Sequence, residues 1–430
     1  MLKKLTLEFL VRRGEKKIVN KRTICIVGNG CAAMECIKSL RGKGYVGAIH
    51  LFSDSIWPSY NPMLTTYYAA GKMDFETFFP YGWDIYKQHK VHLHLGSPVI
   101  EVDALNRTVK NEAGIKIHYD HCLIASGAKP MLPSIPGIKS KKVYTMRTIE
   151  DSIALRQALQ GCPRKALVIG ASMVGVKVVE AFHKIGVEVC LADLAESIFP
   201  LAAHPACAQV IQGRLEQKGI KLRFGAGIER IEESAAGLQV YFCGNKEPEE
   251  ADLLVMCIGT KANIDFLDKD QVAMDRGILV DAHQRTNIST LYAAGDVAQG
   301  CNLLTGEKQI IGLWANARYQ GRTAGLNMLG IGDEYQGSIP QNITHFLDMV
   351  FVGIGDMWHG NREEKQFDGH TYLHFVWNNE QLIGVNLLDD FTEAGVFKQA
   401  LLKGLLNPAK PIDLAALNNL AILLAEFKTR

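Results

Sequence analysis

The sequence predicts an α/β fold that contains the same strand, turn, helix and strand unit twice. One copy spans residues 23–54 and the other spans residues 165–193. In each copy a short apolar strand leads into a glycine turn, an amphipathic helix and a second strand that ends at an acidic residue. This order is typical of Rossmann-like dinucleotide-binding domains, in which the strands form a parallel sheet.

The segments around the two units predict how the domains are divided. After the second unit, residues 276–329 return to a strand and a helix that can rejoin the first domain, so the two domains are expected to be interleaved. Further strands and a terminal helical run predict a C-terminal α+β domain. The predicted parts are an extension at 1–21, a first domain at 22–140 and 265–335, a second domain at 141–264, and a C-terminal domain at 336–430.

Charge and composition exclude two classes of partner. A net charge of +2 provides no electrostatic footprint for nucleic acid or for an anionic membrane surface. No apolar run approaches the roughly 18–20 residues that span a bilayer. The ten cysteines are scattered and none lies in a C-x-x-C pair, which favours free thiols in a reducing cytoplasm.

The first glycine turn follows the apolar strand and fits the pattern G-x-G-x-x-A. Gly28 permits the tight turn, Gly30 lets a pyrophosphate approach the backbone, and Ala33 lets the helix pack closely on the strand. The helix N-terminus offers N–H groups to the phosphates, and Asp54 is placed to bind a ribose diol. The contacts expected in this unit are Gly28, Gly30, Cys31, Ala32, Ala33 and Asp54.

The second glycine turn has a serine at the middle position. Ser172 is small enough for a phosphate to approach, although less freely than glycine allows. Asp193 ends the following strand, where a carboxylate favours the free 2′-hydroxyl of NADH and repels the 2′-phosphate of NADPH. Residues 194–197 supply no arginine for that phosphate, so NADH is the expected ligand. The contacts expected here are Gly170, Ser172, Met173, Val174, Gly175 and Asp193.

With these residues in view, the chain resembles the flavoproteins that carry two dinucleotide folds. That family includes rubredoxin and ferredoxin reductases, the flavin domains of NADH-dependent nitrite reductases, and coenzyme A disulfide reductases. The resemblance runs from about residue 22 to the end of the chain. Its further marks are the segments LIASGA at 123–128, CIG at 257–259, LYAAGDVA at 291–298, and the helix expected at 314–325.

The resemblance implies FAD in the first fold and NADH in the second. It adds to the expected FAD contacts Pro62, Val99, Ala125, Ser126, Gly127, Gly295, Asp296 and Trp314, and to the NAD contacts Gly259. The helix that begins at Trp314 is expected to face the flavin pyrimidine, where its positive end would stabilise negative charge on reduced flavin. The C-terminal part resembles the family's interface domain, which implies a homodimer or membership of a larger complex.

Departures from the family pattern argue against thiol chemistry at the flavin. Cys31 and Cys36 have the C-x-x-x-x-C spacing of a redox pair, but they precede Asp54 and lie on the helix of the glycine motif, where cysteine usually belongs to the core. Relatives with a single redox cysteine carry it in the loop after the ribose acid, and that position is Met63 here. A thioether cannot form the thiolate nucleophile that those reactions need.

A lysine lies where ferredoxin-reductase-like members tend to carry glutamate near the flavin. Lys177 follows Gly175 by two residues, and its ammonium would stabilise reduced flavin if it reached the ring. Alternatively, Lys177 lies on a solvated helix face. Both interpretations stay open, and Lys177 is the one catalytic candidate. Pro62 stands where these members usually carry arginine.

No metal site is predicted. His92 and His94 would share one face of a strand, but the further ligands that zinc requires are not evident. His374, in the C-terminal domain, has no evident chemistry.

The sequence therefore predicts hydride transfer from NADH to the flavin, followed by electron transfer to an acceptor. The acceptor is a redox protein such as rubredoxin or ferredoxin, or a partner subunit. A second hypothesis is an NADH oxidase or a small-molecule reductase that uses oxygen, a quinone or an organic substrate. A third is a flavin- or NAD-binding scaffold without turnover, although the three acids Asp54, Asp193 and Asp296 argue against it.

Overall fold

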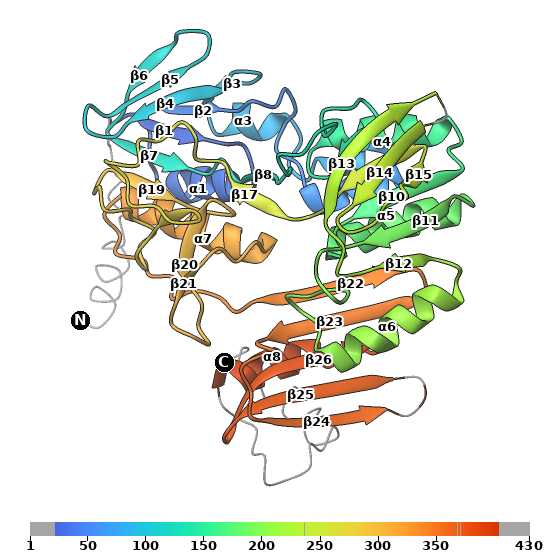
Figure 1. Cartoon of the computed structure of the whole chain (residues 1–430). Coiled ribbons are helices and arrows are strands. Elements are labelled where there is room, and N and C mark those ends of the chain that lie inside the picture. The colour runs from blue at the N-terminus through green and yellow to red at the C-terminus, as the bar shows by residue number, and fades with distance from the viewer. Residues whose placement is uncertain (1–21, 236, 368, 370, 404–430) are drawn as a thin grey trace, which may run out of the picture.

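The computed structural model describes residues 22–235, 237–367, 369 and 371–403. Within them the chain forms three lobes, two built on parallel sheets and one on an antiparallel sheet (Figure 1). The predicted N-terminal extension at 1–21 lies outside the described residues, as does the end of the C-terminal run at 404–430.

The first lobe is built on a parallel sheet with the strand order β19-β7-β1-β2-β3. These strands are β1 (Ile24–Val27), β2 (Ile49–Phe52), β3 (Val91–His94), β7 (His121–Ile124) and β19 (Leu291–Ala293). Every residue of β1 is buried, because α1 (Cys31–Gly42) and α7 (Trp314–Met328) cover one face of the sheet. The other face packs on an antiparallel sheet of β4 (Val99–Asp103), β5 (Thr108–Asn111) and β6 (Lys116–His118).

The second lobe repeats this design with the strand order β12-β11-β10-β16-β9. These parallel strands are β9 (Val143–Thr145), β10 (Lys165–Ile169), β11 (Glu188–Ala192), β12 (Lys221–Arg223) and β16 (Leu253–Met256). The helices are α4 (Ile149–Gln160), α5 (Met173–Lys184) and α6 (Pro205–Gln217). A three-stranded antiparallel sheet of β13 (Ile228–Ser234), β14 (Gly237–Phe242) and β15 (Glu249–Ala251) covers the face opposite α5.

Two antiparallel strands mark the places where the chain enters and leaves the second lobe. β8 (Ala128–Pro130) pairs with β17 (Thr260–Ala262), so both crossings run side by side. The chain then returns to the first lobe through β19, which pairs with β7 at the edge of the first sheet. The fold is therefore α/β with two interleaved Rossmann-like domains, as the sequence predicts.

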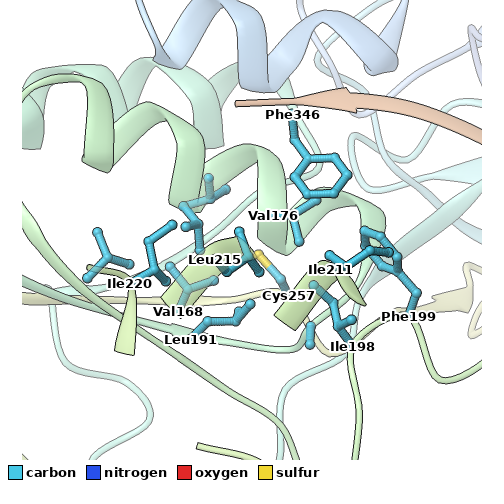
Figure 2. Packing of buried hydrophobic residues seen from close by; sticks show 14 of the residues in the cluster. Val168, Val176, Leu191, Ile198, Phe199, Ile211, Leu215, Ile220, Cys257 and Phe346 are labelled. Atoms are coloured by element: carbon cyan, nitrogen blue, oxygen red, sulfur yellow. The ribbon is translucent and has the colours of Figure 1, made fainter. Parts of the chain in front are cut away.

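The third lobe is a five-stranded antiparallel sheet with one described helix. Its strands are β22 (Gln341–Phe346), β23 (Met349–Gly355), β24 (Arg362–Phe367), β25 (Tyr372–Asn378) and β26 (Gln381–Leu388), followed by α8 (Ala394–Lys403). It shares a hydrophobic core with the second lobe, in which Phe346 lies beside Val176 of α5 and Phe199 packs against Phe351 (Figure 2). The sheet and the second lobe therefore share one continuous core.

Short elements complete the first lobe. They are η1 (Pro62–Leu64), η2 (Phe75–Phe78), α3 (Asp84–Gln88), β18 (Ile278–Leu279), β20 (Ala298–Cys301) and β21 (Lys308–Gln309). The short helix α2 (Thr65–Ala69) instead packs on α4 and α5 of the second lobe, whose core includes Ala69. Among the described residues, no helix is both long enough and apolar enough to cross a membrane.

The two helices of the first lobe pack with their backbones in close contact. A Cβ atom at Gly321 of α7 would lie 2.1 Å from the carbonyl oxygen of Ala32, and one at Gly325 would lie 2.8 Å from that of Cys36. Only a residue without a side chain fits at such an approach. No local sequence pattern marks these two glycines, because their partner lies almost 300 residues earlier in the chain.

We expect Gly321→Ala to destabilise the protein by about 1–3 kcal/mol, since the added methyl group must push α7 away from α1. Thermal or denaturant unfolding measures this change. The control is Gly213→Ala in α6, where an added Cβ has no neighbour within 4 Å. Alanine there should be neutral, or stabilise by up to roughly 1 kcal/mol through helix propensity. Equal stability of the two variants would contradict the close packing of α1 and α7.

Candidate functional site

The first glycine turn lies at the carboxyl end of β1, in the middle of the first sheet. Gly28 has a φ of +107°, and a Cβ there would lie 2.1 Å from the carbonyl oxygen of Ala125. In contrast, a Cβ at Gly30 would meet nothing within 4 Å. Gly30 is also the N-cap of α1 and places no side chain on the helix N–H groups. No side chain at Gly30 caps or covers the N-terminus of α1, and an uncapped helix N-terminus is the arrangement that binds a phosphate.

A cleft of about 350 Å³ lies at this end of the sheet. Four residues that the sequence analysis placed at one site line it together, namely Gly28, Asp54, Val99 and Ser126. The carboxylate of Asp54 is exposed at the end of β2. The hydroxyl of Ser126 donates a hydrogen bond to the carbonyl oxygen of Asn263, 2.7 Å away, and so is oriented by the strand that returns from the second lobe.

The remaining expected contacts surround the same sheet edge. Cys31, Ala32, Ala33 and Ala125 are buried in the core beneath the turn. A Cβ at Gly295 would lie 3.6 Å from both Ala32 of α1 and Ala317 of α7, so the carboxyl end of β19 lies between the two helices. Helix α7 begins at Trp314, and its N-cap residue Leu313 makes no side-chain cap.

Asp296 forms an ion pair that the sequence analysis did not anticipate. Its Oδ2 atom accepts a hydrogen bond from Nη2 of Arg147 at 2.7 Å, and both side chains are partly buried. The Nε of Arg147 also donates to the carbonyl oxygen of Ala128 at 3.2 Å, and Gly127 lies next to the guanidinium. Arg147 belongs to no glycine motif, so no local pattern marked it.

The second glycine turn has the same backbone as the first but a different cap. Gly170 has a φ of +109°, and a Cβ at Gly175 would lie 1.9 Å from the carbonyl oxygen of Gly170. The hydroxyl of Ser172 accepts a hydrogen bond from the N–H of Gly175 and donates one to the carbonyl oxygen of Cys257. The serine therefore caps α5 and ties the turn to β16, a role that its small size alone did not predict.

Asp193 is held in place by the backbone around it. Its carboxylate accepts hydrogen bonds from the N–H groups of Ala171 at 2.6 Å and Ala195 at 2.8 Å. These bonds fix the acid at the end of β11, beside the glycine turn. The carboxylate remains partly exposed and lines a large cleft.

That cleft has a volume of about 930 Å³ and runs between the two nucleotide-binding lobes. Ser172, Met173, Val174, Asp193 and Gly259 line one part of it, as the sequence analysis expected of an NAD site. Arg147, Asp296 and Gly312 line another part. Asp296 and Gly312 come from the first lobe, whereas Arg147 and the first set come from the second, so the cleft connects the second glycine turn to the carboxyl end of β19.

Lys177 and Pro62 line neither of these clefts. The ammonium of Lys177 lies 4.7 Å from the centre of the Tyr67 ring and 3.5 Å from a carboxylate oxygen of Glu180. Its side chain is only 12% exposed, so it does not lie on a solvated helix face. Pro62 begins the short helix η1.

The cysteines around the first turn are not poised for redox chemistry. Cys31 and Cys36 are buried, and burial raises the pKa of each thiol to about 12. Met63, which the family resemblance aligns with a redox cysteine, is 57% exposed and carries no thiol. Cys257 lines the large cleft, but burial raises the pKa of its thiol to about 12 as well. A protonated thiol is a poor nucleophile, so none of these residues provides a thiolate.

Comparison with known proteins agrees with this geometry. The sequence profile of the pyridine nucleotide-disulphide oxidoreductase family matches residues 22–321. The epsilon subunit of NADH-dependent phenylglyoxylate dehydrogenase from Aromatoleum evansii is 29% identical over 385 residues, which cover 88% of this chain and 91% of that subunit. The assimilatory nitrate reductase electron transfer subunit of Bacillus subtilis is 27% identical, and the match spans 89% of this chain but 46% of that protein.

Solved structures share the fold. A ferredoxin reductase from Rhodopseudomonas palustris has a TM-score of 0.84 at 22% identity, over 92% of this chain and 98% of that one. A water-forming NADH oxidase from Lactobacillus brevis has a TM-score of 0.83 at 23% identity, over 89% of this chain and 90% of that one. This chain belongs to the pyridine nucleotide-disulphide oxidoreductase family and is an FAD-dependent NAD(P)H oxidoreductase.

Proposed function

We propose that this chain passes electrons from NADH, through bound FAD, to a protein redox carrier or a partner subunit. The observation that carries the proposal is the single cleft that joins Asp193 to Asp296 and Gly312. The names of several relatives support it, among them a subunit of an NADH-dependent dehydrogenase, an electron transfer subunit, and a ferredoxin–NAD(+) reductase component from Paraburkholderia xenovorans.

The residues of the first lobe fit FAD. The open space in front of Gly30 and the uncapped N-terminus of α1 suit a pyrophosphate, and the cleft beside Asp54 suits the adenosine half. Asp296 and the N-terminus of α7 would hold the ribityl chain and the pyrimidine side of the ring. Bound FAD supplies the electron acceptor for hydride from NADH and releases the electrons singly or in pairs.

The side chains of this chain bind and orient rather than transfer protons. Arg147 fixes the carboxylate of Asp296 in one orientation and links the two lobes at the cleft. The uncapped N-terminus of α7 contributes a positive dipole end, which favours negative charge nearby. Apolar side chains of the cleft wall, including Met146, Phe199 and Met256, exclude water from the path between the two sites.

We further propose a cytoplasmic location and assembly through the C-terminal domain. All ten cysteines are free, which suits a reducing compartment. The exposed Phe367 and Phe391 of the C-terminal lobe suit an interface with a second copy or a partner subunit.

The choice of acceptor is tested by reoxidising the NADH-reduced protein in a stopped-flow instrument. If a carrier or a subunit is the acceptor, reoxidation by air is slow, and rubredoxin, ferredoxin or the co-purified subunit accelerates it by at least about tenfold, since a docked partner removes the diffusional limit. Fast reoxidation by air with no further acceleration would favour an NADH oxidase instead. The Methanocaldococcus jannaschii NADH oxidase, 26% identical over 341 residues, is a relative of that kind.

The assignment of NADH is tested with Asp193→Asn, which keeps the shape of the side chain and removes its charge. We expect kcat/KM for NADH to fall by roughly 10–100-fold, as for loss of a hydrogen bond to a charged group. We also expect the discrimination against NADPH to weaken, because the 2′-phosphate no longer meets a carboxylate. Steady-state kinetics with both nucleotides measure the change. If the ratio of kcat/KM for NADH to that for NADPH is unaltered in the variant, Asp193 does not contact the ribose.

The role of Lys177 at the flavin stays a prediction, and Lys177→Ala tests it. If its positive charge stabilises reduced flavin, the variant has a lower flavin reduction potential and is reduced more slowly by NADH. The control is Lys184→Ala, which removes a more exposed ammonium from the same carboxylate of Glu180. If the flavin reduction potential and the rate of reduction by NADH are unchanged in Lys177→Ala, Lys177 contacts Tyr67 and Glu180 but does not act on the flavin.

A further inference from the structure

Two histidines and one glutamate meet where the second lobe contacts the C-terminal sheet. His204 is the N-cap of α6, Glu363 lies on β24 and His374 lies on the neighbouring strand β25. Nε2 of His204 lies 3.2 Å from one carboxylate oxygen of Glu363, and Nε2 of His374 lies 3.2 Å from the other. One ring nitrogen of each histidine and one carboxylate oxygen of Glu363 all lie within 4.8 Å of one another.

We propose that this cluster binds a divalent transition-metal cation of the zinc class. Two imidazole nitrogens and one carboxylate oxygen form a ligand set that binds zinc in preference to magnesium or calcium. Around a tetrahedral ion with bonds of about 2.0–2.1 Å, neighbouring ligand atoms lie roughly 3.3 Å apart. Each nitrogen already lies at about this distance from one of the two carboxylate oxygens, and the three ligand atoms lie within 4.8 Å of one another. Rotation of the side chains must bring both nitrogens toward one cation.

The residues around the cluster suit a metal site. His374 is fully buried, and its Nε2 atom lies 3.2 Å from a carboxylate oxygen of Glu363. The hydroxyl of Tyr372 lies 2.9 Å from Nδ1 of His374 and orients the ring with Nε2 toward Glu363. Glu363 is 53% exposed, so water reaches the cluster and takes the fourth tetrahedral position.

Cation binding determines which nitrogen of each imidazole ring carries the proton. Without a cation, Nε2 of each histidine lies 3.2 Å from a carboxylate oxygen of Glu363. A zinc-class cation binds the deprotonated Nε2 of each ring, so the ring proton lies on Nδ1 when the cation is bound. Nδ1–H of His374 then donates to the hydroxyl of Tyr372, while His204 gives up its long contact of 3.4 Å with the N–H of Ala206.

The site would hold one wall of the large cleft in place. Residues 199–202 line the cleft and lead directly into His204. The buried amide of Asn386 already ties this loop to the C-terminal sheet, since it donates to the carbonyl oxygen of Ala202 and accepts from the N–H of His204. A cation on His204, Glu363 and His374 adds a second link between the same two segments.

The test uses the full-length, FAD-loaded protein after chelation and dialysis. Titration with Co²⁺ and then Zn²⁺ is followed by calorimetry, by the visible absorption of tetrahedral Co²⁺, and by thermal unfolding. We expect a single cation per chain and a higher Tm. Glu363→Gln, which changes an exposed ligand without changing its size, should lose at least about 100-fold in affinity, and Tyr372→Phe roughly 10–100-fold.

The control is His359→Ala, which removes an exposed histidine of the same lobe that pairs with Asp356 at 2.7 Å. This variant should bind the cation as the unaltered protein does and gain the same stability. Absence of tetrahedral Co²⁺ absorption in the unaltered protein would overturn the proposal, and so would an affinity that Glu363→Gln leaves unchanged. In either case the cluster is a hydrogen-bonded triad.

Discussion

The close packing of α7 on α1 is the constraint on which the rest of the molecule depends. Gly321 and Gly325 let the backbones of the two helices touch, although one helix comes from the start of the chain and the other follows the whole second lobe. This contact brings the carboxyl end of β19, with Asp296, beside the glycine turn of β1. The first site is therefore complete only after the chain has left the first lobe, formed the second and returned.

The return of the chain also explains why the two sites share one cleft. β8 and β17 pair where the chain crosses between lobes, and Arg147 and Ser126 are anchored close to those crossings. The second glycine turn then shares one cleft with Asp296 and Gly312. On the opposite side, the C-terminal sheet supports the cleft wall through Asn386 and through the cluster of His204, Glu363 and His374. Electron transfer between two bound cofactors requires this fixed relation of the lobes.

The two nucleotide-binding units can be predicted from the sequence because short, local residue patterns define them. Each glycine turn has a spacing that follows from backbone geometry, and Asp54 and Asp193 follow at the ends of the next strands, so both units and the interleaved fold were recognised. Contacts between distant segments left no such pattern. In the sequence, Gly321 does not differ from other small helical residues, and only the fold shows that it packs against Ala32. Arg147 lies in no motif. His204 and His374 come from different lobes. The bond that Ser172 donates to the carbonyl oxygen of Cys257 likewise joins residues that lie 85 positions apart.

The central claim is that one cleft brings the nicotinamide of NADH to the flavin. Anaerobic titration of the FAD-loaded protein with NADH tests it most directly, with the flavin absorbance as the readout. The structure predicts that the flavin bleaches in proportion to added NADH and is fully reduced near one equivalent. A flavin that stays oxidised under excess NADH would contradict electron transfer through this cleft and would make the chain a nucleotide-binding scaffold.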